Sequence, residues 1–368
     1  MKIRLATAAL GTLVIGSGAH AQSPVSYRID RGSALPPEAN QAADRMVAKG
    51  AGGFTIATGT GAKEVSRVSF GGIAPDQRFP IASASKWLTA ATVMAVVDEG
   101  KLSLDRPVST WLPKITGDAG KLTLRQLLSQ TSGIVGSRAE LYDLAQDHRI
   151  TLGQSAEEVT ARPLVTRPGD VFVYGGPGFQ VAGAAVEAAT GKRWAQVFYE
   201  KIAGPLGMTH TYWTHLRLDR TDELPVAETL NPVLQGGAVS TAEDYMHFLS
   251  MLAQGGAYQG KRILSRASVD AMLSDQTPSA RMTPTGASVL EDAHYSLGSW
   301  CETWNAQGKC DRNSSIGAFG VYPWVERKTG GYGIVFLYLR EDAFRMWPEI
   351  QVIRDATGRR TTGRGRPR

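Results

Sequence analysis

The sequence predicts an α/β (α+β) fold: a mainly antiparallel sheet formed by both chain ends and flanked by helices, with an inserted helical lobe. Two observations support this prediction. Strand patterns bounded by glycines occupy residues 52–72 and 315–340, near the two ends of the chain. Between them, apolar residues recur mainly at helical spacing. Strands at both ends with helices between them favour one sheet closed by the termini, with the middle as a second lobe.

The first residues, MKIRLATAALGTLVIGSGAHAQS, have the pattern of an export signal. Lys2 and Arg4 precede an apolar run, and small residues stand before Gln22, so we expect cleavage after Ala21. The apolar run is short for a membrane span, and an uncleaved membrane anchor is the alternative. The prediction is therefore a periplasmic or secreted protein with residues 1–21 removed and no transmembrane segment.

The remaining chain is predicted to form one catalytic domain, residues 22–353, with a cleft between two lobes as the usual place for a site. The expected sheet lobe comprises about residues 22–82 and 290–353, and the helical lobe about residues 83–289. The last residues, 354–368, are predicted to be a disordered basic tail because they are rich in Gly and Arg and lack apolar periodicity.

That tail carries most of the formal net charge of +6, because it holds six arginines and one acid. A solvated tail is the expected state, and contact with an anionic surface is the alternative. No nucleic-acid partner is expected, and we expect a monomer.

Periodicity and turn residues predict the elements in order. The first are a helix at residues 36–48 and a hairpin of strands at 52–59 and 63–72. An apolar helix follows at 83–98 and ends at Gly100. Further helices are predicted at 122–133, 178–191, 193–204 and 241–256, then strands at 315–327 and 330–340, and a final helix at 342–354.

Cys301 and Cys310 are the two cysteines of the chain. In an oxidising compartment they are expected to form a structural disulfide that closes a hairpin-like loop. Two cysteines with no histidine near them do not supply four zinc ligands. No metal and no organic cofactor is therefore expected.

The predicted helix at residues 83–98 begins with Ser83 and Lys86, which lie three residues apart and so share one helix face. A serine needs a nearby base to act as a nucleophile. Burial and the positive end of the helix dipole would lower the pKa of Lys86 enough to make it that base. The alternative is a serine that only caps the helix, with its lysine in solvent.

The residues around this pair resemble a known family. FPIASASKWLTAATVMAVVDEG and LTLRQLLSQTSGI, with segments that continue to Leu339, are similar to serine hydrolases related to class C β-lactamases and penicillin-binding D-alanyl-D-alanine peptidases. The resemblance extends from Pro36 and implies the β-lactamase/transpeptidase-like fold. It also implies that Ser83 forms an acyl-enzyme.

The family's second motif is usually Tyr-x-Asn, and the resemblance places it at FVYGGPG. Tyr174 would then act with Lys86 as general base and return a proton to the leaving group. Gly176 stands where the asparagine is usual. The motif's amide, which would hold the substrate and steady the lysine, is therefore missing.

The register of the resemblance places the third motif at Ser315-Ile316-Gly317, at the start of a predicted strand. Gly317 would let the substrate approach the strand closely. The backbone amide of Ala318 would complete an oxyanion hole with that of Ser83. A literal Lys-Thr-Gly at residues 328–330 is instead predicted to be a turn between two strands.

Gly176 and Ser315 differ from the residues usual in the family, and these two differences determine the predicted substrate. Ser315 cannot supply the cation with which the family binds a substrate carboxylate, and relatives without these groups look more like esterases. We expect an exported serine hydrolase acting on small carboxylic esters, so that a small-molecule ester or amide is its partner. The alternatives are a β-lactamase or D-alanyl-D-alanine peptidase-like amide hydrolase, and a non-catalytic penicillin- or wall-ligand-binding protein.

Overall fold

The structure is a computed structural model that describes part of the chain. The described residues are 27–136, 147, 149–214, 230–283, 290 and 292–362. The predicted export signal and residues 363–368 of the predicted tail lie outside them. Among the described residues, no helix has both the length and the apolar character needed to cross a membrane.

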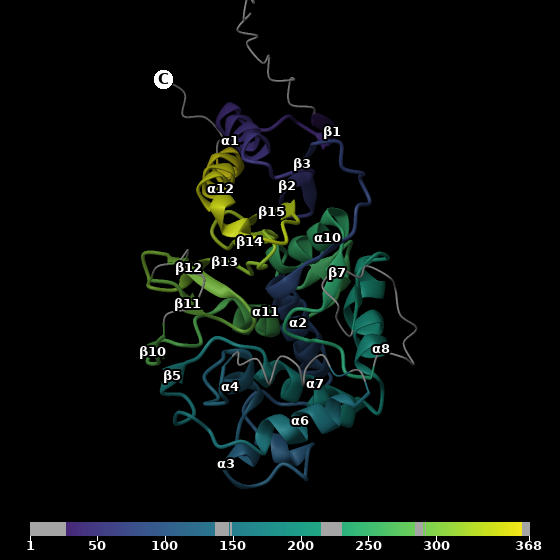
Figure 1. Ribbon diagram of the computed structural model, residues 1–368, viewed down its shortest axis with the longest axis vertical. Helices are drawn as coiled ribbons and strands as arrows, with labels where there is room; N and C mark the ends of the chain where they lie inside the picture. Colours follow the sequence, from purple (N-terminus) through teal and green to yellow (C-terminus); the bar gives the residue numbers. More distant parts are fainter. Residues whose placement is uncertain are drawn as a thin grey trace, which may run out of the picture.

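A large antiparallel sheet takes its strands from both ends of the chain (Figure 1). Within the described residues its eight strands are, in spatial order, β1 (Tyr27–Gly32), β3 (Lys63–Phe70), β2 (Phe54–Thr60), β15 (Gly331–Leu337), β14 (Tyr322–Glu326), β13 (Cys310–Ser314), β12 (Trp300–Trp304) and β11 (His294–Tyr295). The predicted hairpin is confirmed as β2 and β3. Strand β15 pairs with β2 along its whole length, which joins the two ends of the chain in one sheet, as predicted.

Helices dominate the stretch between β3 and β11, which fills the lower part of Figure 1. The helices of the described residues are α1 (Pro37–Ala48), α2 (Ser85–Asp98), α3 (Gly117–Gly120), α4 (Leu124–Leu128), α6 (Leu152–Thr160), α7 (Pro177–Thr190), α8 (Trp194–Phe198), α9 (Gly204–Leu206), α10 (Ala242–Ala253), α11 (Arg266–Leu273) and α12 (Trp347–Thr362). Single turns are η1 (Ala82–Ala84), η2 (Val108–Thr110), η3 (Tyr199–Ala203) and η5 (Ala343–Met346).

Short strands outside the large sheet connect the helical segments. They are β4 (Phe79–Pro80), β7 (Ala238–Ser240) and β6 (Tyr212–Trp213) in one small sheet, β5 (Val171–Phe172) with β10 (Arg281–Met282), and β8 (Ala257–Tyr258) with β9 (Lys261–Arg262). Strand β4 immediately precedes the start of η1 and α2. Its pairing with β7 therefore fixes the entry to α2 beside the segment that leads into β7.

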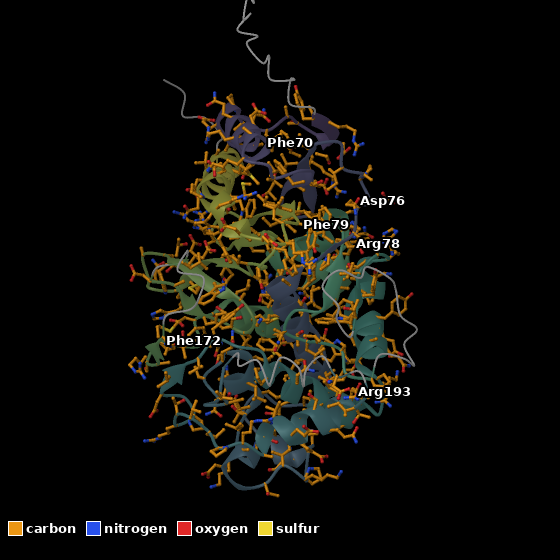
Figure 2. The ribbon with its side chains drawn as sticks, viewed as in Figure 1. Phe70, Asp76, Arg78, Phe79, Phe172 and Arg193 are labelled. Atoms are coloured by element: carbon orange, nitrogen blue, oxygen red, sulfur yellow. A yellow bond between two sulfur atoms is a disulfide. The ribbon has the colours of Figure 1, made fainter. Side chains whose placement is uncertain are left out.

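Helices from opposite ends of the chain cover one face of the sheet. Helices α1 and α12 pack side by side (Figure 1). Ala39, Ala42 and Ala43 of α1 are fully buried, and such small side chains permit close approach of the two helices. Beside them, Phe70, labelled in Figure 2, stacks on Phe54 with ring centroids 5.0 Å apart. This cluster joins both chain ends in one core.

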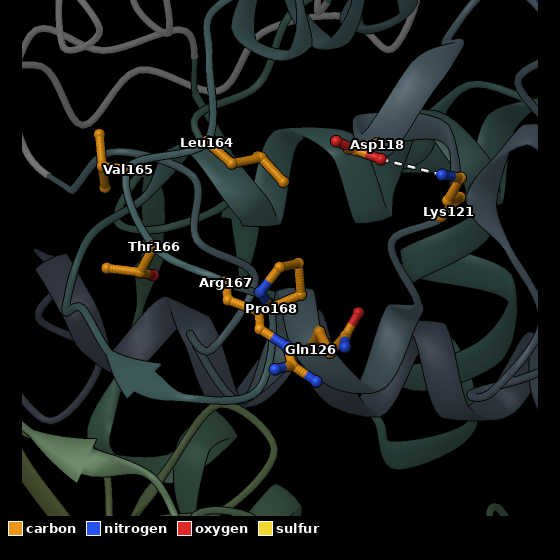
Figure 3. Close-up of a pocket in the computed structure, with 8 residues that line it drawn as sticks. All are labelled: Asp118, Lys121, Gln126, Leu164, Val165, Thr166, Arg167 and Pro168. Atoms are coloured by element: carbon orange, nitrogen blue, oxygen red, sulfur yellow. Dashed lines mark hydrogen bonds and ion pairs between the residues drawn. The ribbon is translucent and has the colours of Figure 1, made fainter.

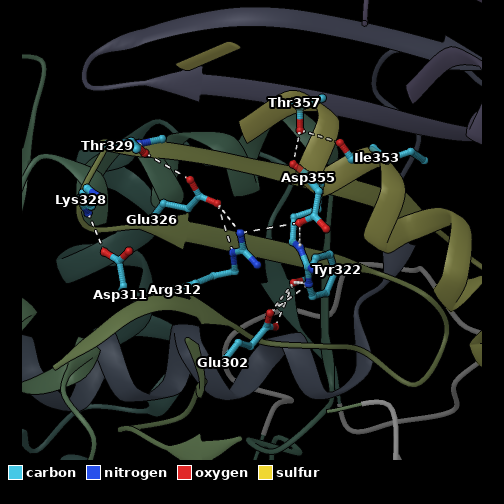
Figure 4. A network of polar contacts seen from close by, with 12 residues as sticks. Glu302, Asp311, Arg312, Tyr322, Glu326, Lys328, Thr329, Ile353, Asp355 and Thr357 are labelled. Carbon is cyan, nitrogen blue, oxygen red and sulfur yellow. Dashed lines mark hydrogen bonds and ion pairs between the residues drawn. The ribbon is translucent and has the colours of Figure 1, made fainter. Parts of the chain in front are cut away.

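Helix α12 extends past the predicted start of the tail. The sequence prediction begins disorder at Arg354, whereas α12 continues to Thr362. Arg354 is buried, and it donates hydrogen bonds to a carboxylate oxygen of Glu302 at 3.1 Å and to the Tyr322 hydroxyl at 3.0 Å. Figure 4 shows Glu302 and Tyr322 within a larger polar network. The tail prediction is wrong for these residues because a distant acid gives the first tail arginine a buried partner.

The strand predicted at residues 315–327 is also wrong in its extent. Strand β13 ends at Ser314, β14 begins at Tyr322, and the two pair antiparallel across the reversal between them. In that reversal the Gly320 amide donates to the Gly317 carbonyl at 2.9 Å. Gly320 has φ +100°, which favours glycine. The apolar sequence pattern does not reveal this turn, because the turn residues other than Ala318 remain buried.

Strands β12 and β13 carry the two cysteines. The structure joins Cys301 and Cys310 by a disulfide, with their Cα atoms 5.6 Å apart. The two residues lie on neighbouring antiparallel strands, so the loop between them is the hairpin that the sequence suggested.

Helix α2 runs through the centre of the molecule (Figure 1). Twelve of its fourteen residues are buried, and it contacts α7 and α11. A helix that is buried on all sides belongs to the interior of a large protein. Any polar side chain near its beginning must therefore find its partners inside the protein.

Candidate active site

Ser83 lies in η1, immediately before α2, rather than in the first turn of α2 as predicted. The N-cap of α2 is Ala84, and no side chain caps the helix, so Ser83 is not a capping serine. Ser83 is half-buried, whereas Ala82 and Ala84 on either side are buried. Ser83 therefore lies at the boundary between the buried interior and the protein surface.

Hydrogen bonds from other elements hold this turn in place. The Ala238 amide of β7 donates to Ser85 Oγ at 3.0 Å, and the Tyr245 hydroxyl of α10 donates to the Ala84 carbonyl at 2.8 Å. Ala82 has φ +45°, an unusual value for a residue with a side chain. Such outliers cluster at functional sites, where the surrounding structure must hold them.

Lys86 occupies the interior beside Ser83. Its Nζ lies 3.1 Å from Ser83 Oγ and donates to the backbone carbonyl of Gln235 at 2.9 Å. The residue is 3% exposed, and no carboxylate among the described residues forms an ion pair with it. Burial lowers the pKa of Lys86 to about 7. Since a buried amine without a counter-charge loses its proton readily, Lys86 can act as a base near neutral pH.

Tyr174 lies between β5 and α7 and is half-buried. The centroid of its ring is 4.8 Å from Lys86 Nζ. The ring stacks on Trp300 of β12 with centroids 5.4 Å apart, and it meets the edge of Tyr295 at 6.1 Å. Phe172, labelled in Figure 2, completes this aromatic group. The fold thus brings the predicted tyrosine beside the predicted lysine.

The predicted third motif lies against the backbone of the serine turn. Ser315 Oγ is 3.2 Å from the Ser83 carbonyl oxygen and 3.3 Å from that of Gly298, and the residue is buried. A Cβ on Gly317 would stand 2.4 Å from the Ile81 carbonyl oxygen, so only glycine fits there. The Ser315 hydroxyl therefore supports the backbone of Ser83.

Ala318 is the exposed residue of the turn that follows Gly317. The amides of Ser315 and Gly317 donate to the carbonyls of Pro323 and Val321, across the β13–β14 reversal. These two amides are consequently engaged within the fold. The pairing of the Ala318 and Ser83 amides as an oxyanion hole stays a prediction.

The literal Lys-Thr-Gly at residues 328–330 lies in the turn between β14 and β15, which confirms the turn prediction. The Lys328 amide donates to an Asp311 carboxylate oxygen at 2.9 Å, as Figure 4 shows. Ser315 lies across from the first residues of β14, whereas Lys328 follows its last residue. The lysine is therefore beyond the opposite end of the strand.

Sequence reasoning missed Gln235. Its carbonyl is the acceptor for Lys86, and its side chain lies where a side chain on Gly176 would be. A glutamine followed by two glycines matches no sequence motif that would mark it as a site residue. Only the fold relates Gln235 to the other site residues.

A hollow of about 680 Å³ lies elsewhere, over the helical part of the chain (Figure 3). Its lining residues are Asp118, Lys121, Gln126, Leu164, Val165, Thr166, Arg167 and Pro168. Asp118 and Lys121 form an exposed ion pair at 2.9 Å. None of the predicted site residues lines this hollow, so the candidate site rests on the contacts of Ser83, Lys86 and Tyr174.

Comparisons with known proteins bear on this site. The family model described as Beta-lactamase matches residues 39–353. The 6-aminohexanoate-dimer hydrolase of Paenarthrobacter ureafaciens is 26% identical over 76% of this chain and 71% of the hydrolase. Protein Rv1367c of Mycobacterium tuberculosis is 30% identical over 55% of this chain. The chain spans 60% of the length of that mycobacterial relative.

Solved structures share the fold. A protein of Bacteroides dorei, provisionally described as a beta-lactamase, superposes with a TM-score of 0.78 at 30% identity, covering 90% of this chain and 100% of that chain. A family VIII carboxylesterase superposes with a TM-score of 0.68 at 19% identity, covering 91% and 99%. At that identity, the second similarity shows the fold alone.

Proposed function

The chain belongs to the Beta-lactamase family, and we propose that it is a serine hydrolase whose nucleophile is Ser83. The observation that carries the proposal is the contact between Ser83 Oγ and Lys86 Nζ at 3.1 Å, made by a lysine that burial leaves with a pKa of about 7. A nucleophile beside a base of matched pKa is the arrangement that covalent catalysis requires.

The proton path follows from the contacts of the lysine. Neutral Lys86 donates one hydrogen to the Gln235 carbonyl, which directs its lone pair toward the Ser83 hydroxyl. As Ser83 Oγ bonds to the substrate carbonyl carbon, the hydroxyl proton passes to Nζ. Lys86, with Tyr174 beside it, then returns that proton to the leaving group. Water releases the acyl group and restores Ser83.

Small carboxylic esters are the proposed substrates. The Ser315 side chain is directed at the Ser83 backbone and carries no charge with which to bind a substrate carboxylate. The partly exposed ring of Tyr174, packed on buried aromatic rings, supplies an apolar surface next to Lys86, which suits an uncharged acyl or alcohol group. Hydrolysis of a small amide is the second candidate, because a relative that covers most of the chain is a 6-aminohexanoate-dimer hydrolase. Export and a monomeric state are proposed on sequence grounds alone.

Intact-protein mass spectrometry tests this proposal. We expect a short-chain aryl ester to acylate the protein or to be turned over rapidly, and Ser83→Ala to abolish both. Ser274→Ala, at the end of α11, is the matched control and should behave as the wild type. A long-lived adduct with a penicillin alone would favour a penicillin-binding protein. No Ser83-dependent reaction with an ester, an amide or a penicillin would contradict the proposal.

A second test is the pH dependence of kcat/KM for an ester that does not ionise. Because the base form of Lys86 is the neutral amine, activity should be low below its pKa, rise through about pH 7 and level off above. The measurement is kcat/KM from about pH 5.5 to 9, within the range where the protein stays folded. A profile that is flat across this range, or that falls as the pH rises, would exclude Lys86 as the base.

A further inference from the structure

Gly176 is where the family usually has an asparagine, and the space for its side chain is already filled. A Cβ on Gly176 would lie 1.0 Å from Oε1 of Gln235 and 1.6 Å from its Cδ. Two groups cannot share that volume. Since Gly176 has φ −123°, the backbone itself would accept a larger residue. While the carboxamide of Gln235 keeps this position, which it reaches from another part of the chain, only glycine fits at residue 176.

Buried hydrogen bonds hold Gln235 in this position. Its carbonyl accepts from Lys86 Nζ at 2.9 Å. One residue earlier, the Leu234 amide donates to Gln180 Oε1 of α7 at 2.8 Å. Gln180 Nε2 in turn donates to Asn231 Oδ1 at 2.9 Å. The segment before β7 is thus fastened to α2 and α7 together, which places the backbone of Gln235 beside Lys86.

The carboxamide oxygen of Gln235 is left without a hydrogen-bond partner in the described part of the chain. Gln235 is 4% exposed, and its Oε1 is buried and accepts no hydrogen bond from a described residue. Buried polar atoms are usually satisfied, so an unsatisfied one requires an explanation. A bound substrate that brings a hydrogen-bonding group beside Lys86 would provide it.

We infer that Gln235 is a specificity-determining residue, whose carboxamide replaces the motif asparagine from a different element and holds the acyl part of the substrate. The inference rests on the proposed function and refines its substrate class. An unsatisfied carboxamide oxygen calls for a donor. The preferred acyl groups therefore carry an N–H close to the reacting carbonyl, as in esters of N-acylated glycine.

Two aryl esters of equal length test the preference. The N-acetylglycyl ester has the N–H, and the pentanoyl ester replaces the peptide group with methylenes. The wild type should prefer the N-acetylglycyl ester, and Gln235→Leu should remove the preference by lowering kcat/KM for that ester about tenfold, the effect of one hydrogen bond. The readout is the ratio of kcat/KM for the N-acetylglycyl ester to kcat/KM for the pentanoyl ester, which should fall about tenfold in this variant. Gln196→Leu, an exposed glutamine of α8, is the matched control.

Variants that carry the carboxamide at residue 176 instead of residue 235 test whether Gln235 replaces the motif asparagine. Gly176→Asn alone should destabilise the protein and lower turnover of both esters, because the new side chain displaces the carboxamide of Gln235 from its buried position. The double variant Gly176→Asn with Gln235→Gly should recover both stability and the N-acetylglycyl preference. A double variant that is no better than either single change would overturn the inference.

The outcomes separate this inference from the proposed function. If Gln235→Leu slows both esters equally, Gln235 is only a structural filler and the inference fails, while Ser83-dependent turnover still supports the hydrolase. If Ser83→Ala leaves turnover intact, the proposed function fails. In that case the thermal stabilities of the Gly176 and Gln235 variants still show whether a carboxamide at residue 176 can replace the one at residue 235. Thermal stability is measured without catalysis.

Discussion

Replacing Lys86 with methionine is expected to lower kcat/KM for an ester by about 10²- to 10⁴-fold, the contribution typical of a general base. Methionine is close to lysine in length and apolar, so it fills the same buried space without the amine. Since Lys86 Nζ is the group 3.1 Å from Ser83 Oγ, its loss leaves the hydroxyl without that base. The measurement is steady-state kinetics, with circular dichroism to confirm that the variant is folded.

Lys328 supplies the control for this substitution. It belongs to the literal Lys-Thr-Gly, but it lies in the exposed β14–β15 turn. Lys328→Met should keep kcat/KM within about twofold of the wild type, because the substitution touches no site residue. If Lys328→Met abolished activity and Lys86→Met did not, the assignment of the base would be reversed.

Replacing Arg354 with methionine is expected to destabilise the protein by about 3–5 kcal/mol, the usual cost of removing one partner of a buried ion pair. The side chains of Arg354 and Glu302 are 9% and 5% exposed. Without Arg354, the Glu302 carboxylate keeps hydrogen bonds from Tyr322 and Ser314 but loses its counter-charge. The measurement is the free energy of unfolding in urea, with the exchange rates of amides in α12 as a local readout.

Two further variants check the cause. Arg327 pairs with Asp270 at the surface, and Arg327→Met should cost at most about 1 kcal/mol. The double variant Arg354→Met with Glu302→Leu should recover a large part of the lost stability, because no buried charge remains unpaired. A double variant less stable than Arg354→Met would show that the ion pair is not the reason for the loss.

Local patterns predicted those parts of the fold that depend on neighbours in sequence. The β2–β3 hairpin and helix α1 follow from alternation, helical periodicity and turn residues, and the structure has both. Two predictions failed. The turn at Gly317–Gly320, closed by a local hydrogen bond, interrupts a pattern that looked like one strand. Arg354 continues a helix because a distant residue, Glu302, lies across from it.

The sequence by itself determined the closeness of Ser83 and Lys86, because residues three positions apart lie on one face of a helical turn. The tertiary structure decided the remainder. The pKa of Lys86 is lowered because α2 is buried, and the acceptor of its hydrogen bond lies 149 residues further along the chain. The Gln235 side chain occupies the space that a side chain on residue 176 would take, because α7 and the segment before β7 pack together. Spacing fixes contacts within a turn, whereas contacts between distant segments depend on how the whole core packs.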